Sequence, residues 1–357
     1  MDLNVFKTLA NLRILKLSWN QLIKLEPTLF TTLFKLTRLD LNNNELATLD
    51  DIQLFKNLVN LEELSLQHNK LTTLNPNIFK TLTNLQYLDL NHNQLTQLDS
   101  NLFGSLTNLH ELDLHANMFN QTFNATLFNN LTNLNKLTLS WCQLTSLDSN
   151  LFQTIFNLKE LSLTGNQLSE LHPSLFNQLI KLEKLELNQN RLKSLDSTLF
   201  QNLTMLKGLF LSENQLRHLP PSLFRSQTKM NRLDLGSNLL EDLDVSIFRS
   251  LSLLEELHLD RNRLTQLPSD LFENLVSLEK LYLDSNELTT ILDPSVFESL
   301  SKLSQIETIN NKVTWLDSNM MKMFRNLQTL SLTANNLSPI DRVLIKNLKN
   351  IKQLYLD

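Results

Sequence analysis

Residues 85–106, LQYLDLNHNQLTQLDSNLFGSL, contain the pattern that decides the fold. Leu85, Leu88 and Leu90 begin the frame L-x-x-L-x-L-x-x-N-x-L, in which Asn93 is the asparagine, and a phenylalanine follows near the end of the segment. Two leucines separated by one residue point to the same side of an extended chain. The frame therefore predicts a short strand that buries one side and leaves the other side exposed.

The same frame repeats along the whole chain. The step from one opening residue to the next is 24 residues, except for three steps of 25. This register predicts one domain over residues 1–357, with a partial unit at 1–11, fourteen full units over 12–350 and a partial unit at 351–357. Repeats 1 to 14 are numbered by their opening residues: Leu12, Leu36, Leu61, Leu85, Leu109, Leu134, Leu158, Leu182, Leu206, Met230, Leu254, Leu278, Leu303 and Leu327.

Two further positions recur with the leucines. The asparagine of the frame stands where the chain turns inward, and its amide can pair with buried backbone groups of its own and adjacent turns. Cys142 takes this position in repeat 6, and we interpret it as a small buried structural residue; a reactive thiol is the alternative. A phenylalanine occurs once in almost every repeat, which predicts a stacked and buried spine and not an aromatic stripe that binds a ligand.

The frame L-x-x-L-x-L-x-x-N-x-L resembles the leucine-rich repeat, and the 24-residue unit with its phenylalanine resembles the typical class of that family. This class occurs in Toll-like receptors, chaoptin-like adhesion proteins and small proteoglycans. The resemblance implies an α/β-type solenoid, or horseshoe, with about fifteen short parallel strands on the concave face. Short turns or 3-10 helices are expected on the convex face, where Asp, Ser and Pro can begin a single turn.

The resemblance also implies an extracellular or cell-surface recognition domain. Such domains usually carry cysteine-rich caps, which this chain lacks. Because both ends hold partial units, we expect the chain to be part of a longer protein and to self-associate through its uncapped ends. A cytoplasmic location is the alternative, since the chain contains one cysteine and Met1–Asn11 lacks the pattern of a secretory signal.

Composition excludes several other classes of protein. The net charge is −5 and no basic run of five residues occurs, so a nucleic-acid partner is not expected. No apolar stretch reaches the length of a membrane span. The sequence contains no glycine-rich phosphate loop, nucleophile elbow or paired CxxC motif. We therefore expect neither an enzyme nor a cofactor.

The exposed strand positions vary between repeats, so we expect the partner-binding residues among them. Exposed aromatic residues flanked by charges are typical of protein interfaces. Because these positions lie between the core positions, no core contact should need them. The candidates on the concave face are Tyr87, Asp89, His92, Glu111, Asp113, His115, Trp141, Phe210, Arg261 and Tyr282.

Asp89 and Asp113 occupy equivalent positions on adjacent predicted strands, with His92 and His115 nearby. Two carboxylates and two imidazoles suggest a metal or acid–base site. The alternative, which we favour, is an acidic patch that a basic partner neutralises, so no metal site is predicted. The sequence thus predicts binding of a protein ligand, with or without glycans. The protein is either a cell-surface receptor or adhesion protein, or an intracellular adaptor or substrate-binding module.

Overall fold

The computed structural model describes residues 5–289, 294–314, 326–337 and 350–356. The chain forms two compact units. Unit 1 comprises Met1–Leu168 and Ser174–Leu182, and unit 2 comprises Ser169–Pro173 and Glu183–Asp357. Whether the two units fold as the single domain expected from the sequence stays a prediction.

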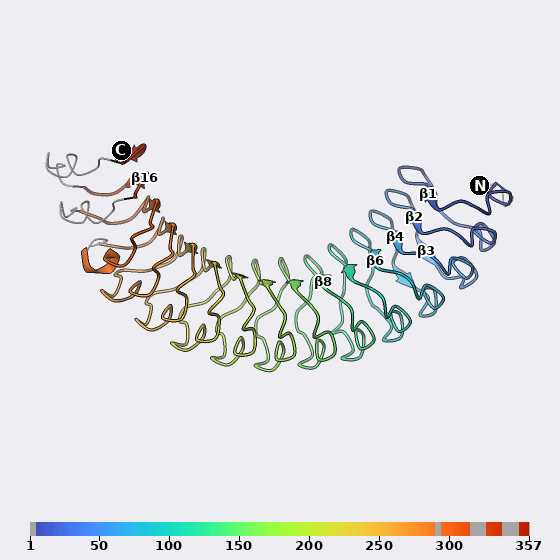
Figure 1. The fold of residues 1–357 in the computed structure, drawn as a ribbon, viewed down its shortest axis with the longest axis horizontal. Helices are drawn as coiled ribbons and strands as arrows, with labels where there is room; N and C mark the ends of the chain where they lie inside the picture. Colours follow the sequence, from blue (N-terminus) through green and yellow to red (C-terminus); the bar gives the residue numbers. More distant parts are fainter. Residues whose placement is uncertain (1–4, 290–293, 315–325, 338–349, 357) are drawn as a thin grey trace. The chain divides into compact units, whose positions relative to one another are not determined.

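In unit 1 each repeat contributes one strand of three residues to a parallel sheet (Figure 1). The central leucines of neighbouring strands are paired, as Leu88 is with Leu112. Two shorter strands, β3 (Thr48–Leu49) and β5 (Thr73–Leu74), form a second parallel sheet. The strands of the main sheet, in order, are β1 (Ile14–Lys16), β2 (Arg38–Asp40), β4 (Glu63–Ser65), β6 (Tyr87–Asp89), β7 (Glu111–Asp113), β8 (Lys136–Thr138) and β9 (Glu160–Ser162).

Unit 2 repeats this arrangement with eight described strands and one 3-10 helix, η1 (Pro294–Phe297). With the seven strands of the main sheet in unit 1, the expected number of about fifteen short parallel strands is confirmed. The strands of unit 2, in order, are β10 (Lys184–Glu186), β11 (Gly208–Phe210), β12 (Arg232–Asp234), β13 (Glu256–His258), β14 (Lys280–Tyr282), β15 (Gln305–Glu307), β16 (Thr329–Ser331) and β17 (Gln353–Tyr355).

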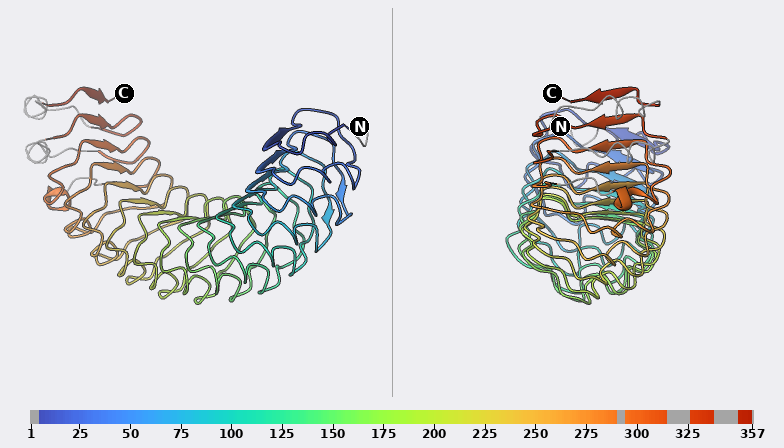
Figure 2. Two further views of the ribbon diagram at one scale, coloured as in Figure 1. Left: turned by 45° about the vertical axis from the view of Figure 1, so that its right-hand side comes forward. Right: turned by 90° about the vertical axis from the view of Figure 1, so that its left-hand side faces the viewer.

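Within each unit, the strands lie side by side along one face and turns occupy the opposite face (Figure 2). The turns begin as the sequence predicts. The Asp99 carboxylate accepts the N–H of Asn101 at 2.8 Å, and Asp196 binds the N–H of Thr198 in the same way. Apart from η1, the described residues on this face form turns and no helix. Each aspartate side chain pairs with a single main-chain N–H, which is enough to stabilise one tight turn.

The core consists of the frame leucines and the phenylalanine spine. Leu85, Leu88 and Leu90 are fully buried. Phe103, Phe128 and Phe152 lie in successive repeats with ring centroids 6.3 and 6.4 Å apart and nearly parallel planes. Each ring removes about 150–250 Å² of surface from water. The spine is therefore packing, as predicted, and its rings are not available to a ligand.

The asparagine of the frame joins adjacent repeats. Asn93 Nδ2 donates to the carbonyl oxygens of Leu66 at 3.0 Å and Leu90 at 3.1 Å, and its Oδ1 accepts the N–H of Leu71 at 3.1 Å. One side chain thus satisfies three buried main-chain groups in two repeats. Equivalent bonds recur in both units, as at Asn44 and Asn262. The predicted role of this position is confirmed.

Asn214→Ala should lower the free energy of unfolding by at least about 2 kcal/mol, because each buried main-chain group that loses its partner costs about 1–3 kcal/mol. Asn214 binds the carbonyl oxygens of Leu187 and Leu211 and the N–H of Leu192. Urea unfolding followed by circular dichroism measures the loss. The control is Gln215→Ala at the next, exposed residue, which should change stability by less than about 0.5 kcal/mol. Equal losses in the two variants would contradict the assigned register.

If the chain is one domain, a substitution that destabilises unit 2 should also lower the stability of unit 1. Asn214→Ala should then lower the urea midpoint at which the buried Cys142 thiol becomes reactive, by the same amount as the midpoint seen by circular dichroism. Thiol labelling along the urea series measures the first midpoint. A thiol midpoint that stays at its wild-type value would show that the two units unfold independently.

Candidate functional site

Each repeat leaves four side chains outside its core on the strand side. They are the first and third residues of the strand and the two residues that follow the next core position. In repeat 4 these are Tyr87, Asp89, Asn91 and His92. This set of positions, taken over all repeats of a unit, is called the strand face below.

All ten candidate residues occupy strand-face positions. Seven lie in repeats 4 to 6 of unit 1, whose strands β6, β7 and β8 are neighbours, and Phe210, Arg261 and Tyr282 lie in unit 2. Exposure varies among them. Trp141 is 51% exposed, whereas Asp89 is only 4% exposed. The expectation that Asp89 is freely accessible is wrong, because the neighbouring side chains cover it.

The last strand-face position has a left-handed backbone in both units. Its φ is 48° at His92, 56° at Trp141 and 53° at Arg261. Residues with a Cβ atom lose about 1–2 kcal/mol in this conformation. The turn that brings the next asparagine into the core requires this left-handed conformation. The backbone therefore fixes the direction of three candidate side chains, which the sequence pattern did not reveal.

Tyr87 and Asp89 are joined on the surface of β6. The Tyr87 hydroxyl donates to Asp89 Oδ2 at 3.1 Å, and Asp89 Oδ1 accepts the N–H of Asn91 at 3.0 Å. Burial raises the pKa of Asp89 to about 6, and the nearby Asp113 also raises it, although the Asn91 N–H opposes the change. Burial and the adjacent Asp89 carboxylate also raise the pKa of Tyr87, so its hydroxyl stays protonated.

Asp113 lies beside Asp89 on the adjacent strand, as predicted. Asp113 Oδ1 accepts the N–H of His115 at 2.9 Å, and Oδ2 accepts the side-chain amide of Asn91 at 3.3 Å. Each oxygen of the two carboxylates thus already accepts a hydrogen bond. In the described parts of the chain, no group of three or more His, Cys, Asp or Glu residues could hold a metal ion. Asp89 and Asp113 are therefore better described as an acidic surface held in place by hydrogen bonds than as an acid–base centre. Tyr87 and Asp113 make these bonds at the surface, so the expectation that no core contact needs them stays a prediction.

Three histidines form a row across repeats 3 to 5. The rings of His68 and His92 are stacked with centroids 4.2 Å apart, and His115 lies 4.9 Å from His92. His92 Nδ1 is 3.0 Å from Asn91 Oδ1. Burial, followed by the charges that His68 and His115 would carry, lowers the pKa of His92. The sequence pattern indicated His92 and His115 but not His68, although His68 occupies the same frame position as His92.

Trp141 is placed by a glycine of the next repeat. Gly165 has φ +69°, and a Cβ atom there would lie 2.4 Å from Trp141 Cδ2. The indole therefore lies directly on the glycine backbone, while half of the side chain stays exposed. Among the described residues of unit 1, Gly165 is the only glycine in the left-handed position. This contact fixes the ring and leaves it free to meet a partner.

In unit 2, Phe210 lies between two cations. The Lys184 ammonium is 5.5 Å and the Arg232 guanidinium 5.3 Å from the ring centroid. Gly208 allows this placement, because a Cβ atom there would approach the ring to 3.0 Å. Lys184 also pairs with Glu186. The sequence pattern indicated Phe210 but not the two cations, which lie on the adjacent strands, or Gly208, which lies two residues before Phe210 on the same strand.

Tyr282 stacks on His258, with ring centroids 4.3 Å apart. His258 Nε2 lies 2.7 Å from Glu256 Oε1. Burial opposes the charged form of His258, but its bonds to Asp260 and Glu256 outweigh this effect and raise the pKa of the imidazole. Arg261 is exposed in the left-handed position, and its N–H donates to the carbonyl of Asp284. Tyr282 thus lies in a charged cluster of unit 2, and the main chain of Arg261 is bonded to the repeat that carries Tyr282.

The structure supports the structural interpretation of Cys142. Its side chain is fully buried, and Sγ donates to the carbonyl oxygens of Leu114 at 3.1 Å and Ser140 at 3.4 Å. It thus replaces the frame asparagine as a donor. Burial raises the pKa of the thiol to about 12, although main-chain N–H groups oppose this change.

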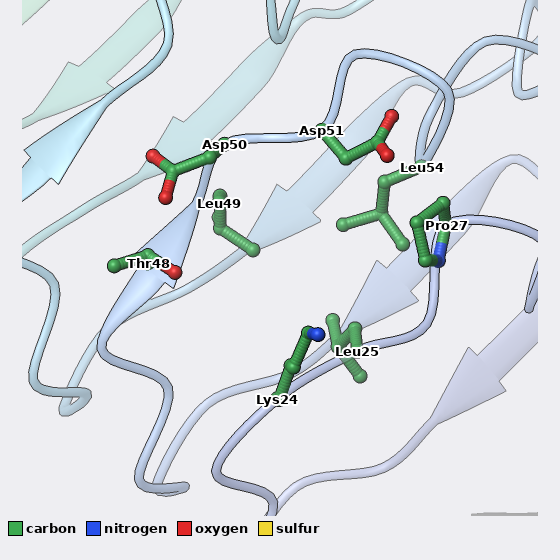
Figure 3. A pocket seen from close by; sticks show the side chains of 8 residues that line it. All are labelled: Lys24, Leu25, Pro27, Thr48, Leu49, Asp50, Asp51 and Leu54. Atoms are coloured by element: carbon green, nitrogen blue, oxygen red, sulfur yellow. The ribbon is translucent and has the colours of Figure 1, made fainter.

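A hollow of about 340 Å³ lies between repeats 1 and 2, away from the strand face (Figure 3). Leu25, Leu49 and Leu54 point into it, and the Lys24 side chain lies at its rim. Repeat 2 has one residue more between Leu49 and Phe55 than repeat 1 has between Leu25 and Phe30, and Asp51 lies in this longer loop. None of the ten candidate residues lines the hollow.

A family model for the leucine rich repeat matches nine overlapping segments that together span residues 34–313. No curated protein sequence matches the chain. No helix in the part of the chain that the structure describes has the length and hydropathy needed to cross a membrane. The matched segments are 34–95, 59–119, 83–144, 132–192, 156–216, 180–240, 206–264, 228–288 and 252–313.

Three solved structures show the same fold. A leucine-rich-repeat protein of Leptospira interrogans is 29% identical, with 99% of this chain and 98% of that chain covered and a TM-score of 0.75. A chain of the glycosylated Toll–Spatzle complex of Drosophila is 26% identical, with coverage of 99% and 52% and a TM-score of 0.82. The ectodomain of a plant membrane receptor kinase from Arabidopsis thaliana is 28% identical, with coverage of 97% and 42% and a TM-score of 0.71. The chain thus spans about half or less of the two receptor chains.

The buried and protonated Cys142 thiol should not react with an aromatic disulfide reagent at pH 8, because the thiolate is the reacting species. One equivalent of thiol should react after unfolding in guanidinium chloride. Absorbance of the released thiolate measures both reactions. Complete reaction of the folded protein within minutes would support the alternative of a reactive thiol.

Proposed function

The chain belongs to the leucine-rich repeat family, and on that premise we propose that it is the ligand-binding part of a cell-surface receptor or adhesion protein. The partner is proposed to be a protein, with or without glycans. We propose that it binds the strand face of repeats 4 to 6, where Tyr87, Asp113 and Trp141 are the main contacts. The family architecture itself is a scaffold for recognition, since stacked repeats present an extended surface.

The observation that carries this proposal is the placement of Trp141. Its indole lies on Gly165 and is half exposed, so the ring is ordered before a partner arrives. A pre-ordered aromatic side chain loses little conformational entropy on binding. Tryptophan and tyrosine are also enriched among the residues that dominate binding energies. Glu111 and Asp113 lie on the neighbouring strand and supply charge beside the ring.

The similar structures support a receptor role. The Drosophila structure is described as a complex of Toll with Spatzle, and the plant ectodomain as a complex with an integrity factor of the Casparian strip. Both similar chains are thus described together with a protein ligand. The location of the present chain at the cell surface is part of the proposal.

An intracellular adaptor or substrate-binding module is the second candidate. The single cysteine, Cys142, favours it, because extracellular repeat domains of this class usually hold disulfide-bonded caps. Surface biotinylation of cells that express the complete gene separates the two candidates. Labelling of intact cells supports the receptor, and labelling only after lysis supports the adaptor. Two expectations stay predictions in either case: that the protein is not an enzyme, and that it self-associates.

The binding site is tested by changing two strand-face residues after a partner has been identified by cross-linking on intact cells. The double variant Asp113→Asn and Trp141→Ala keeps the oxygen that binds the His115 N–H, so its stability should change by less than about 1 kcal/mol. Its affinity for the partner should fall by at least about 2 kcal/mol, or roughly 30-fold. Calorimetric titration measures the affinity.

A matched control changes three exposed residues that follow the buried phenylalanines on the turn side. Lys56→Ala, Lys80→Ala and Gln153→Ala remove as much side-chain surface and leave the strand face intact. This variant should bind the partner like the wild type. If it loses affinity while the double variant does not, the partner binds the turn side and the proposed site is wrong.

A further inference from the structure

The strand face of repeats 3 to 5 has an unusual set of charges. Its twelve positions contain four carboxylates and three imidazoles but no lysine or arginine. The carboxylates belong to Glu63, Asp89, Glu111 and Asp113, and the imidazoles to His68, His92 and His115. Near neutral pH, where imidazoles are mostly uncharged, this surface carries negative charge only.

The flanking strands supply the fixed charges around this surface. Arg38 of β2 pairs with Glu63 at 2.8 Å, and Asp40 lies on the same strand. Lys136 of β8 is aligned with Glu111. Glu63 thus has the Arg38 guanidinium beside it, and Glu111 has Lys136 opposite it on the next strand. Asp89 and Asp113 lie in the centre and contact neutral donors and histidines. A cationic group is the charge that the centre lacks.

The three imidazoles form a row in which His92 contacts both His68 and His115, and the row lies beside the central carboxylates. The His92 ring is stacked on His68 and tilted against His115, and His115 follows Asp113 by two residues. Protonation of the row would place several positive charges a few ångströms apart on the surface that a cationic partner would occupy. The row can thus cancel the attraction at the place where it acts.

We infer that the strand face of repeats 3 to 5 binds a lysine- or arginine-rich segment of the partner near neutral pH and releases it on acidification. This inference rests on the proposed function, because it specifies the partner and the regulation of the same surface.

The direction of the pH effect follows from the groups that take up protons. Imidazole is the side chain whose charge ordinarily changes between about pH 5 and pH 8, so acidification favours positive charge on the histidine row, although burial and the two neighbouring histidines lower the pKa of His92. Burial raises the pKa of Asp89 to about 6, so this carboxylate loses its negative charge in the same interval. Both kinds of proton uptake reduce the net negative charge of the surface. Tyr87 stays neutral because its pKa is raised. Every change therefore weakens the hold on a cation.

The test uses a fluorescent ten-residue peptide of alternating lysine and glycine as the probe. Fluorescence anisotropy at constant low ionic strength measures its affinity at pH 7.5 and at pH 5.0. Wild-type protein should bind the peptide at pH 7.5 and bind it at least about 10-fold more weakly at pH 5.0. The triple variant His68→Gln, His92→Gln and His115→Gln should bind at pH 7.5 and lose less than about 3-fold at pH 5.0.

The substitutions are chosen to keep the fold. Gln189 has φ 54° at the same frame position as His68 and His92, so glutamine is accommodated there. The matched control changes three exposed histidines outside the strand face, His110→Gln, His172→Gln and His218→Gln, and should keep the pH dependence of the wild type.

Two results would overturn the inference. One is no binding of the peptide at pH 7.5. The other is an equal loss of affinity at pH 5.0 in wild type and in the variant that lacks the three strand-face histidines. Because the probe is a synthetic peptide, either result leaves the receptor role to the experiment with the natural partner. Loss of partner binding in the Asp113→Asn and Trp141→Ala variant, together with failure of the peptide, would mean a partner that is recognised by its apolar groups.

Discussion

The structure depends on pairing the main-chain groups that turn inward after each strand. A single asparagine side chain does this in most repeats. In repeat 10, Asn238 binds the carbonyl oxygens of Leu211 and Leu235, and its Oδ1 accepts the N–H of Leu216. Buried main-chain groups without partners would cost more than any single leucine contributes. The repeat length and the strand register follow from this bond, because it joins each turn to the preceding repeat.

The same turn constrains the strand face. To bring the asparagine inside, the residue before it takes a left-handed conformation, with φ 51° at Ser237 and 54° at Glu213. Glycine would be the least strained choice, yet in unit 1 it appears only at Gly165, where it makes room for Trp141. Side chains at this position are therefore retained in spite of strain. This pattern is typical of positions that serve binding.

Much of the fold could be predicted from the sequence, because the frame residues repeat with a fixed spacing and each has one structural role. The strands, the phenylalanine spine and the role of Cys142 were all predictable in this way. A second set of bonds was missed. The Asn84 side chain donates to the carbonyl of Val59, and Asn108 donates to that of Thr83. Their exposed positions gave no sign of pairing, since surface asparagines are common in this chain.

The candidate site was harder to predict, because contacts on the strand face join residues of different repeats. Register alone placed Asp89 next to Asp113 correctly. It could not show that the Tyr87 hydroxyl would bond to Asp89, or that the His68 ring would stack on His92. These contacts depend on side-chain rotamers, which neither periodicity nor composition constrains. The variation of residues at the strand-face positions therefore indicated where the candidate site lies. It did not indicate how much of each side chain is exposed.

The acidic residues show why that distinction matters. At the third strand position, the carboxylates of Asp40, Asp113 and Asp234 each accept the N–H two residues later, at 2.9 to 3.1 Å. An aspartate here stabilises the turn whether or not a partner is present. The identity of this residue is thus partly fixed by the fold, although the position faces outward. At the first strand position and the left-handed position, the recurring side-chain bonds go to other side chains, as from Tyr87 to Asp89 and from Gln189 to Glu213. Selectivity for a partner should therefore depend mainly on these two positions. In repeats 4 to 6 these positions hold Tyr87, His92, Glu111, Ala116, Lys136 and Trp141. The strongest effects on binding are therefore expected at the larger of these side chains and not at the central aspartates alone.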